Sequence, residues 1–212
     1  MTAEARAFFD RIATRYDRSY ALSGAESKTR DRALVELLGA PKRVLDVGVG
    51  TGRELSALAG AGHEIVGLEL SPQMIALCNR RTRPIPIVLG DAWVELPFAD
   101  GSFDAIVALH GTLAHPPSEA ALDGFYREAA RVLRGDLVIV EVPMPSWLST
   151  ALSHVRPSDD TAVGRFVDDA NGAEITVQLF SLERWRAAAR GFVIESQPLG
   201  PHEVRLVARR LA

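Results

Sequence analysis

The sequence predicts a doubly wound α/β fold, because short apolar runs alternate with helical patterns between residues 43 and 142. Nearly continuous apolar runs are typical of strands buried on both faces of a parallel sheet. Their alternation with helices calls for parallel strands joined by helical crossovers. The 212 residues, 47% hydrophobic and 24% charged, fit an ordinary globular protein. We therefore expect a single domain over residues 1–212, with its core at 43–142 and 181–212.

Five apolar runs mark the strands expected in this region, at 44–47, 64–70, 85–89, 105–109 and 137–142. Helical patterns lie between them at 53–59, 72–80 and 118–133. Ser71 and Pro72 suit the N-cap and the first position of the second of these helices. Gly60 and Gly135 are expected to end the first and the third.

Residues 1–40 show a further helical pattern. Apolar side chains recur at helical spacing from Ala5 to Tyr16, which predicts a helix there. A second helix is expected over 28–38, because Gly39 and Pro41 supply a stop. We expect residues 1–40 to form a helical cover on the α/β core.

The alternation stops after residue 142. Pro143 and Pro145 interrupt it, and 146–163 looks irregular. A hairpin is predicted around Asn171-Gly172, between 165–169 and 175–180. Because so long a connection is typical of a functional loop, we expect 143–180 to be a lid inserted after the fifth strand. This segment carries aromatic and imidazole side chains that could line a substrate site under the lid, namely those of Trp147, His154, Phe166 and Phe180.

Two further strands are expected at the C-terminal end, at 192–197 and 204–208, after a helix capped by Ser181. Too few residues join these two strands for a parallel crossover, which needs a dozen or more. The two strands must therefore be antiparallel.

Charge and composition argue against several partners. The 24 basic and 27 acidic side chains give a net charge of −3, whereas nucleic-acid binding needs a basic face. No stretch approaches the ~20 apolar residues of a membrane span, and the N-terminus lacks the apolar region of a secretion signal. We expect a cytoplasmic protein with a small-molecule substrate. Its one cysteine, Cys78, excludes an internal disulfide and a cysteine metal cluster, and we expect no metal site.

A glycine-rich turn, Gly48-x-Gly50-x-Gly52, follows the first strand and opens into a helix. Such a turn lets a ligand approach bare backbone at the carboxyl end of a strand. A dinucleotide-binding turn has the pattern Gly-x-Gly-x-x-Gly, but Arg53 stands where its third glycine would fall. Asp46 would also repel a pyrophosphate. The turn therefore points away from a nicotinamide dinucleotide.

The segment 44–52 resembles motif I of the class I S-adenosylmethionine-dependent methyltransferases. Segments 67–74, 90–92, 103–109 and 127–141 are similar to the elements that follow in this family, in the same order. The N-terminal segment 9–17 resembles the small-molecule branch that includes quinone-biosynthesis methyltransferases. The resemblance covers roughly residues 8–142 and 181–208. It implies a mostly parallel seven-stranded sheet with an antiparallel last strand.

The resemblance also implies the cofactor, S-adenosylmethionine, and the reaction, methyl transfer to an O, N or C atom of a small molecule. It assigns Glu69 to both ribose hydroxyls and Asp91 to the adenine amino group. Tyr16 is expected to lie over the sulfonium, which cation–π attraction favours. The other expected cofactor contacts are Asp46, Gly48, Gly50, Gly52, Leu70, Met74, Ala92 and Leu109.

Histidines are the candidate catalytic groups, because their pKa lies near the working pH range. His110 follows the fourth strand, where the transferred methyl group should lie, and we expect it to be catalytic. His115 falls in a Gly-Thr-Leu-x-His pattern that the family shares, which implies a loop-organising role. Positioning alone supplies much of the rate in such reactions. Two alternatives therefore stay open: a cofactor-binding protein of this fold without catalysis, and a nicotinamide oxidoreductase.

Overall fold

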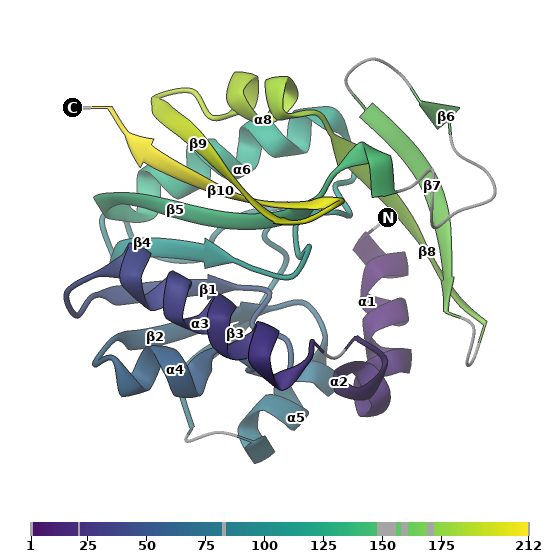
Figure 1. The fold of residues 1–212 in the computed structure, drawn as a ribbon, viewed down its shortest axis with the longest axis horizontal. Helices are drawn as coiled ribbons and strands as arrows, with labels where there is room; N and C mark the ends of the chain where they lie inside the picture. The colour runs from purple at the N-terminus through teal and green to yellow at the C-terminus, as the bar shows by residue number, and fades with distance from the viewer. Residues whose placement is uncertain are drawn as a thin grey trace.

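The computed structural model describes residues 2–20, 22–81, 84–147, 156–157, 161–168 and 172–211. At its centre is a seven-stranded sheet (Figure 1). Its strands are β1 (Arg43–Val47), β2 (Glu64–Glu69), β3 (Ile87–Leu89), β4 (Phe103–Ala108), β5 (Leu133–Pro143), β9 (Phe192–Gly200) and β10 (Glu203–Arg210). They lie in the order β3-β2-β1-β4-β5-β10-β9. Only β10 among these seven runs against the others, since it pairs antiparallel with both β5 and β9. The predicted sheet and its reversed last strand are confirmed.

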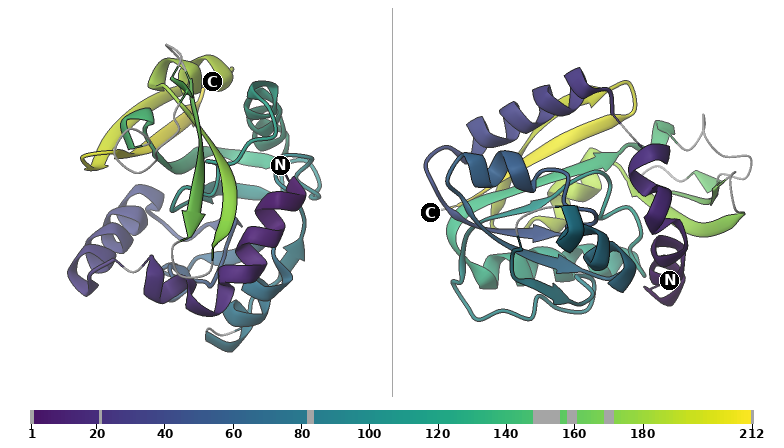
Figure 2. Two further views of the ribbon diagram at one scale, coloured as in Figure 1. Left: turned by 90° about the vertical axis from the view of Figure 1, so that its right-hand side faces the viewer. Right: turned by 90° about the horizontal axis from the view of Figure 1, so that it is seen from below.

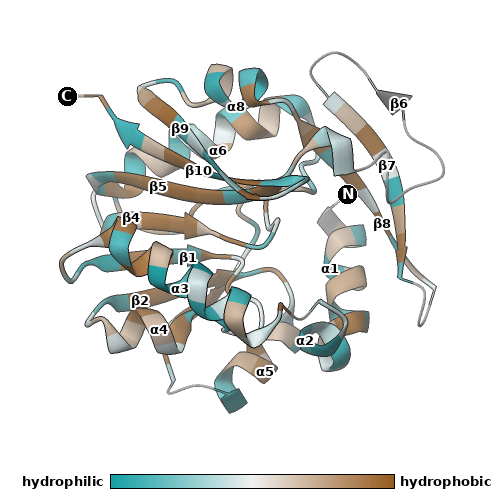
Figure 3. Cartoon of the chain, in the orientation of Figure 1, coloured by the Kyte–Doolittle hydropathy of each residue, from teal (hydrophilic) through white to brown (hydrophobic). Residues whose placement is uncertain are grey.

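Helices cover both faces of this sheet. Helices α3 (Gly24–Leu38), α4 (Leu55–Gly60) and α5 (Pro72–Arg81) contribute to one apolar cluster, and α6 (Glu119–Val132) and α8 (Leu182–Ala188) to another. Side chains alternate along a strand, so Val44 packs into the first cluster and Leu45 into the second. Strands β4 and β5 are strongly hydrophobic along most of their length (Figure 3), as expected for strands covered on both sides.

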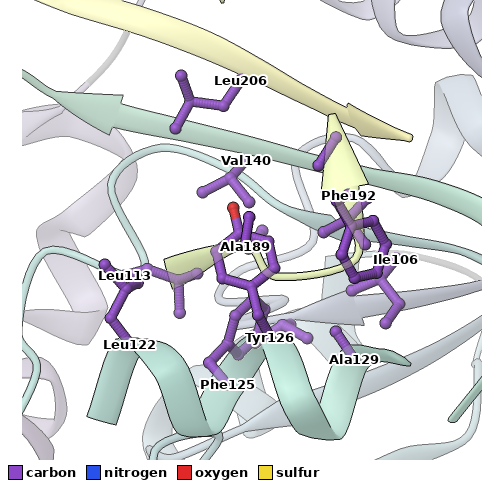
Figure 4. Close-up of a cluster of buried hydrophobic side chains, with 14 of the residues drawn as sticks. Ile106, Leu113, Leu122, Phe125, Tyr126, Ala129, Val140, Ala189, Phe192 and Leu206 are labelled. Atoms are coloured by element: carbon purple, nitrogen blue, oxygen red, sulfur yellow. The ribbon is translucent and has the colours of Figure 1, made fainter. Parts of the chain in front are cut away.

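The cluster under α6 is rich in aromatic side chains. Phe125 and Tyr126 of α6 point toward the strands, where Ile106 and Val140 lie (Figure 4). Trp185 of α8 packs edge-on to the Tyr126 ring, with 6.3 Å between their centroids. These contacts fix the helix that follows the loop after β4, and so hold that loop at the carboxyl end of the sheet.

The junction between α6 and β5 differs from the expectation. The helix ends at Val132, β5 begins at Leu133, and Gly135 lies inside the strand instead of ending the helix. A Cβ atom on residue 135 would stand 2.0 Å from the carbonyl oxygen of Asp104. Gly135 is therefore required by the close passage of β5 over β4.

The N-terminal segment also differs in detail. Helix α1 (Thr2–Ile12) is followed by a 3₁₀ turn over Ala13–Arg15 and by the short α2 (Tyr16–Ser19), where the spacing of apolar residues predicted one helix. Helix α3 begins before the expected residue 28, because Ser23 and Glu26 form a capping box with each other's backbone N–H. Helix α3 packs on the sheet beside α4, and we call residues 2–20 the cover.

A second, three-stranded sheet follows β5. Its strands are β6 (Arg156–Pro157), β7 (Thr161–Asp168) and β8 (Ala173–Phe180). The predicted hairpin is confirmed in the antiparallel pairing of β7 with β8, although residues 169–171 of its turn lie outside the described residues, as does His154. The two long strands lie beside α1 (Figure 2). No helix in the described part of the chain is long and apolar enough to cross a membrane.

Candidate functional site

A cavity of about 560 Å³ opens at the carboxyl ends of the parallel strands. This volume lies within the range of small-molecule sites. One wall comes from the glycine turn after β1, the ends of β2 and β3, and the loop after β4. The rest of the wall comes from α1, α2, β7 and β8, from Glu26 and Arg30 of α3, and from the turn between β9 and β10.

Two glycines of the turn face this cavity, Gly48 at φ +70° and Gly50 at φ +54°. Side chains other than hydrogen are disfavoured at such angles. A Cβ atom on residue 48 would also stand 2.3 Å from the Thr112 Cγ2 atom. At residue 50 the nearest atom would be the Gly48 carbonyl oxygen, 3.7 Å away. Gly50 therefore leaves bare backbone open toward the cavity.

Glu69 ends β2 at the edge of the same cavity and is buried. Its Oε2 atom accepts a hydrogen bond from the Gly50 N–H at 2.9 Å, and Oε1 accepts from the N–H groups of Leu70 and Ser71 at 2.8 Å each. Burial raises the pKa of Glu69, and the three N–H groups oppose that rise. A carboxylate oxygen accepts about two hydrogen bonds, so Oε2 has room for one hydroxyl of a ligand.

Asp91 follows β3 and has an oxygen in need of a partner. Its Oδ1 atom accepts from the Trp93 N–H at 2.9 Å, whereas Oδ2 is buried and no described residue donates to it. Leaving a buried acceptor unsatisfied costs about 1–3 kcal/mol. A donor on a ligand would remove that cost, because Asp91 lines the cavity. The cavity wall also includes three other predicted contacts, Leu70, Met74 and Ala92.

Tyr16 lines the cavity from the first turn of α2. The Arg53 guanidinium lies over its ring at 4.9 Å from the centroid, so one ring face already has a cation partner. Tyr20 packs on Tyr16 with 5.0 Å between ring centroids. Burial raises the pKa of Tyr16 to about 12, despite the opposing charge of Arg53. Tyr16 is therefore a neutral hydroxyl and a packed ring at neutral pH.

Three predicted cofactor contacts do not belong to the cavity wall. Asp46 is buried in the interior with its Oδ2 atom unpartnered among the described residues, and burial with the charge of Glu54 raises its pKa well above the usual range. A Cβ atom on Gly52 would stand 2.7 Å from the Cys78 sulfur, so this glycine serves helix packing. Leu109 lines a second cavity, of about 140 Å³.

His110 lies between the two cavities and lines both. Its backbone has φ +53°. The ring contacts the Glu54 carboxylate through Nε2, and Nδ1 lies 3.9 Å from Glu141 Oε2. Burial lowers the pKa of His110, but the hydrogen bond to Glu54 and the charges of Glu54 and Glu141 outweigh it, so that the pKa is raised. The predicted catalytic histidine therefore lies in an ion network that favours its protonated form.

That network continues into the sheet. Glu141 of β5 binds Arg205 of β10 through Nη2 at 2.5 Å and Nε at 3.0 Å, and both side chains are buried. Sequence reasoning missed Glu54 and Glu141 as partners of His110, because both are distant from it in the chain. The pairing of β4 with β5 brings Glu141 to His110, and the start of α4 brings Glu54 there.

The second half of the cavity is mainly apolar. It is lined by Phe8, Phe9, Trp147, Phe166, Ile175 and Val177. The expected contributions of Trp147 and Phe166 are found there, with 6.0 Å between their ring centroids. Phe180 instead packs against Trp185 in the apolar cluster between the sheet and helices α6 and α8. His115 joins this wall, with its ring edge-on to Phe9 at 5.6 Å.

Residues 2–20 are tied to both sides of the cavity. Asp17 accepts hydrogen bonds from Thr51 Oγ1 at 2.6 Å and from Arg53 Nε at 3.0 Å, and it also pairs with Arg81. On the other side, Arg15 pairs with Asp168 at the end of β7. The cover therefore links the glycine turn to the second sheet.

Comparison with known proteins finds sequence similarity to methyltransferases. A family model described as a methyltransferase domain matches residues 44–136. The chain is 40% identical over 144 residues to a demethylmenaquinone methyltransferase of Beutenbergia cavernae, covering 66% of this chain and 58% of that protein. A demethylmenaquinone methyltransferase of Thermus thermophilus is 37% identical over 146 residues, covering 65% of each. The chain thus spans about three-fifths of the length of such curated relatives.

Solved structures show the same fold over nearly the whole chain. The CcbJ methyltransferase from Streptomyces caelestis superposes with a TM-score of 0.74 at 20% identity, covering 97% of this chain and 98% of that one. The Burkholderia thailandensis 1,6-didemethyltoxoflavin-N1-methyltransferase, solved with its substrate and S-adenosylhomocysteine, gives 0.70 at 22% identity, covering 99% and 88%. Residues 44–136 thus match the methyltransferase-domain family, and the fold of the chain, with the motifs and sheet order above, is that of the class I S-adenosylmethionine-dependent methyltransferases.

Proposed function

We propose that this protein transfers a methyl group from S-adenosylmethionine to a small-molecule acceptor. One observation carries the proposal: a single cavity joins the glycine turn, Glu69 and Asp91 at one end to a mainly apolar chamber at the other. The first end offers groups that suit a nucleoside, and the second offers a separate place for an acceptor. Binding both in one cavity would hold them together for reaction.

The residues present fit the cofactor. Glu69 Oε2 has a lone pair for a ribose hydroxyl, and the unpartnered Asp91 Oδ2 suits an amino group of adenine. A second ribose hydroxyl on Oε1 requires the release of one of its two backbone N–H bonds. Gly50 allows the ligand to lie against the turn. Among the described residues that line the cavity, the one lysine or arginine is Arg30, and it already pairs with Glu141 and Glu203 instead of being free for a pyrophosphate. These features favour S-adenosylmethionine over a nicotinamide dinucleotide.

The bound cofactor supplies an electrophilic methyl carbon on a sulfonium. The protein's own contribution is to orient the acceptor and to exclude water, which strengthens electrostatic interactions inside the site. Phe8 and Phe9 of α1 and Phe166 of β7 form part of the chamber wall. Such walls suit a flat, apolar acceptor. We propose that residues 2–20 and strands β7 and β8 act as the lid of this chamber, and that the lid and the core form a single domain.

Calorimetric titration of the protein with S-adenosylmethionine and with NAD tests the cofactor. We expect binding of the first and not of the second, and the reverse result would favour an oxidoreductase. Formation of S-adenosylhomocysteine with a panel of phenols, amines and acids then tests the reaction. A reduced naphthoquinone belongs in the panel, because the curated relatives are named demethylmenaquinone methyltransferases. Binding without any product would favour the non-catalytic alternative.

A further inference from the structure

His115 stands in the apolar half of the cavity, at the end of the loop that follows β4. Its neighbour Ala114 accepts a hydrogen bond from the Gln178 N–H of β8 at 3.0 Å, which ties this loop to the second sheet. The Phe9 ring meets the imidazole edge-on. The mechanism above gives this residue no task, and a loop-organising role would use only one of its two ring nitrogens.

The geometry fixes which ring nitrogen carries hydrogen. Nδ1 of His115 lies 3.1 Å from the carbonyl oxygen of Thr176. A carbonyl oxygen can only accept, so Nδ1 must donate, and in the neutral ring Nε2 then keeps a lone pair. Among the described residues the ring has one hydrogen-bond partner, the Thr176 carbonyl on Nδ1, and His115 lines the cavity. Thr176 is itself held by Glu4, whose Oε1 accepts from its N–H and its hydroxyl at 3.1 Å each.

The ring is also neutral near pH 7. Burial lowers the pKa of His115 from its usual 6.5 to about 4, although the bond to Thr176 and the charge of Glu4 on α1 act in the opposite direction. The other histidines that line the cavity differ. His110 is paired with Glu54, and His202, in the turn between β9 and β10, has its Nδ1 atom 3.1 Å from Ser146 Oγ. His115 therefore offers an imidazole lone pair inside the apolar chamber.

We propose that Nε2 of His115 accepts the hydrogen bond of a hydroxyl on an apolar aromatic acceptor and takes its proton as the methyl group is transferred. This inference rests on the proposed function. The hydroxyl oxygen forms a bond to the methyl carbon while the carbon–sulfur bond breaks, and that electron pair stays on sulfur. The hydroxyl proton moves to Nε2 and from there to water. The chamber holds one positive charge before the step, on sulfur, and one after it, on the imidazole, so no charge is added.

His115 can accept a proton in this step despite its low pKa, because the total charge in the chamber does not change. Before transfer, a second cation beside the sulfonium would be disfavoured, and a neutral ring avoids it. Proton transfer becomes favourable only as the sulfonium charge disappears, so it accompanies methyl transfer. The acceptor is then selected at the hydroxyl, because an acceptor without a donor leaves Nε2 unpartnered in an apolar surrounding.

Binding of two probes tests the selection without any turnover. The probes are 2-naphthol and 2-methoxynaphthalene, which share a flat apolar ring system and differ in the donor. Titrations are made with S-adenosylhomocysteine present, which cannot donate a methyl group. The wild type is expected to bind 2-naphthol about five- to tenfold more tightly, the effect of one hydrogen bond. Equal affinity for the two probes would overturn the proposal.

Two variants separate the ring nitrogens. In His115→Asn the amide can still donate to the Thr176 carbonyl but does not extend to the position of Nε2, so the preference for 2-naphthol should disappear. In His115→Gln the longer amide brings an oxygen near the position of Nε2, and much of the preference should remain. A preference that survives in His115→Asn, or is lost in both variants while His115→Gln stays folded, would overturn the assignment.

Two measurements keep this result apart from the proposed function. Affinity for S-adenosylmethionine should be unchanged in both variants. If the wild type did not bind S-adenosylmethionine, the proposed function would be refuted. The two probes titrated alone would then still test His115. Long-range ¹H–¹⁵N NMR of the wild type reads the tautomer directly and needs no variant. An unprotonated Nε2 at pH 7 is expected, and a protonated Nε2 would overturn the proposal.

Discussion

The imidazole of His110 contacts the carboxylate of Glu54, and the pair lies between the two cavities of the protein. Both side chains are mostly buried, with exposures of 21% and 8%. Glu141 approaches the same ring from β5. The arrangement favours the protonated form of His110, which connects α4 to the loop after β4. In that form the ring has no lone pair with which to accept a proton.

The pair predicts a pH-dependent contribution to stability. Because the folded state raises the pKa of His110 above 6.5, the pair stabilises the fold below that value and loses its effect as pH rises through the folded pKa. Glu54→Gln should therefore lower the free energy of unfolding by about 1.5–3 kcal/mol at pH 6 and by less at pH 9. Denaturant unfolding at both values measures the difference.

Glu64→Gln is a matched control, because Glu64 forms an exposed ion pair with Arg43. Exposed pairs contribute about 0–1 kcal/mol, so this variant should change stability little at either pH. A loss in Glu54→Gln that is equal at pH 6 and pH 9 would show that Glu54 does not raise the pKa of His110.

Glu69 is predicted to bind the ribose of S-adenosylmethionine. Glu69→Ala should weaken binding about ten- to a hundredfold, the worth of a charged hydrogen bond. It should also lower stability, because the N–H groups of Gly50, Leu70 and Ser71 lose their acceptor. Glu69→Gln keeps an acceptor oxygen for part of this set, so its effect on stability should be smaller. Calorimetry gives the dissociation constants, and an unchanged value in both variants would refute the assignment.

Gly50 is predicted to be required for ligand approach. Gly50→Ala places a methyl group on backbone that lines the cavity, so it should weaken S-adenosylmethionine binding more than tenfold. Gly191→Ala provides the control, since Gly191 also has a positive φ, +84°, with nothing within 4 Å of an added Cβ atom. Both variants bear a backbone strain of roughly 1–2 kcal/mol. Similar melting temperatures with normal binding in both would place the ligand elsewhere.

Phe166 is predicted to contact the acceptor and not the cofactor. It lines the apolar half of the cavity from β7, with Trp147 and Phe8 beside it. Phe166→Ala should raise the KM for an aromatic acceptor at least tenfold, because it removes part of the chamber wall, while the affinity for S-adenosylmethionine stays the same. Val163→Ala, on an exposed position of the same strand, should change neither. Equal losses of acceptor and cofactor binding in Phe166→Ala would mean that the lid is needed for folding of the whole site.

The sequence alone suggests a coarser version of that experiment, in which a Gly/Ser linker replaces residues 146–168. The structure argues against it as a clean test. Strand β7 pairs with β8 from Thr161 to Asp168, and Asp168 binds Arg15 of the cover. Removing the strand would therefore disturb the cover as well as the chamber.

Local sequence determined much of this protein. Apolar runs marked the five parallel strands within a few residues, except that β5 begins four residues before its expected start. Backbone preferences at turns and caps act over a few residues. Local sequence therefore also predicted the glycine turn, the N-cap Ser71 and the short link before β10. The resemblance in motif order then supplied the seven-stranded sheet, which no local pattern encodes.

The tertiary structure decided the charge states and the walls of the site. His110 and His115 belong to one loop, yet Glu54 and Glu141 surround the first, whereas the Thr176 carbonyl and aromatic rings surround the second. These partners lie 31 to 61 residues away in the chain. A pKa depends on burial and on charges within a few ångströms, and only the folded chain sets those distances. The sequence therefore identified both histidines as candidates. The packing of β5, α4 and β8 around them favours a proton on the ring of His110 and leaves a lone pair on Nε2 of His115.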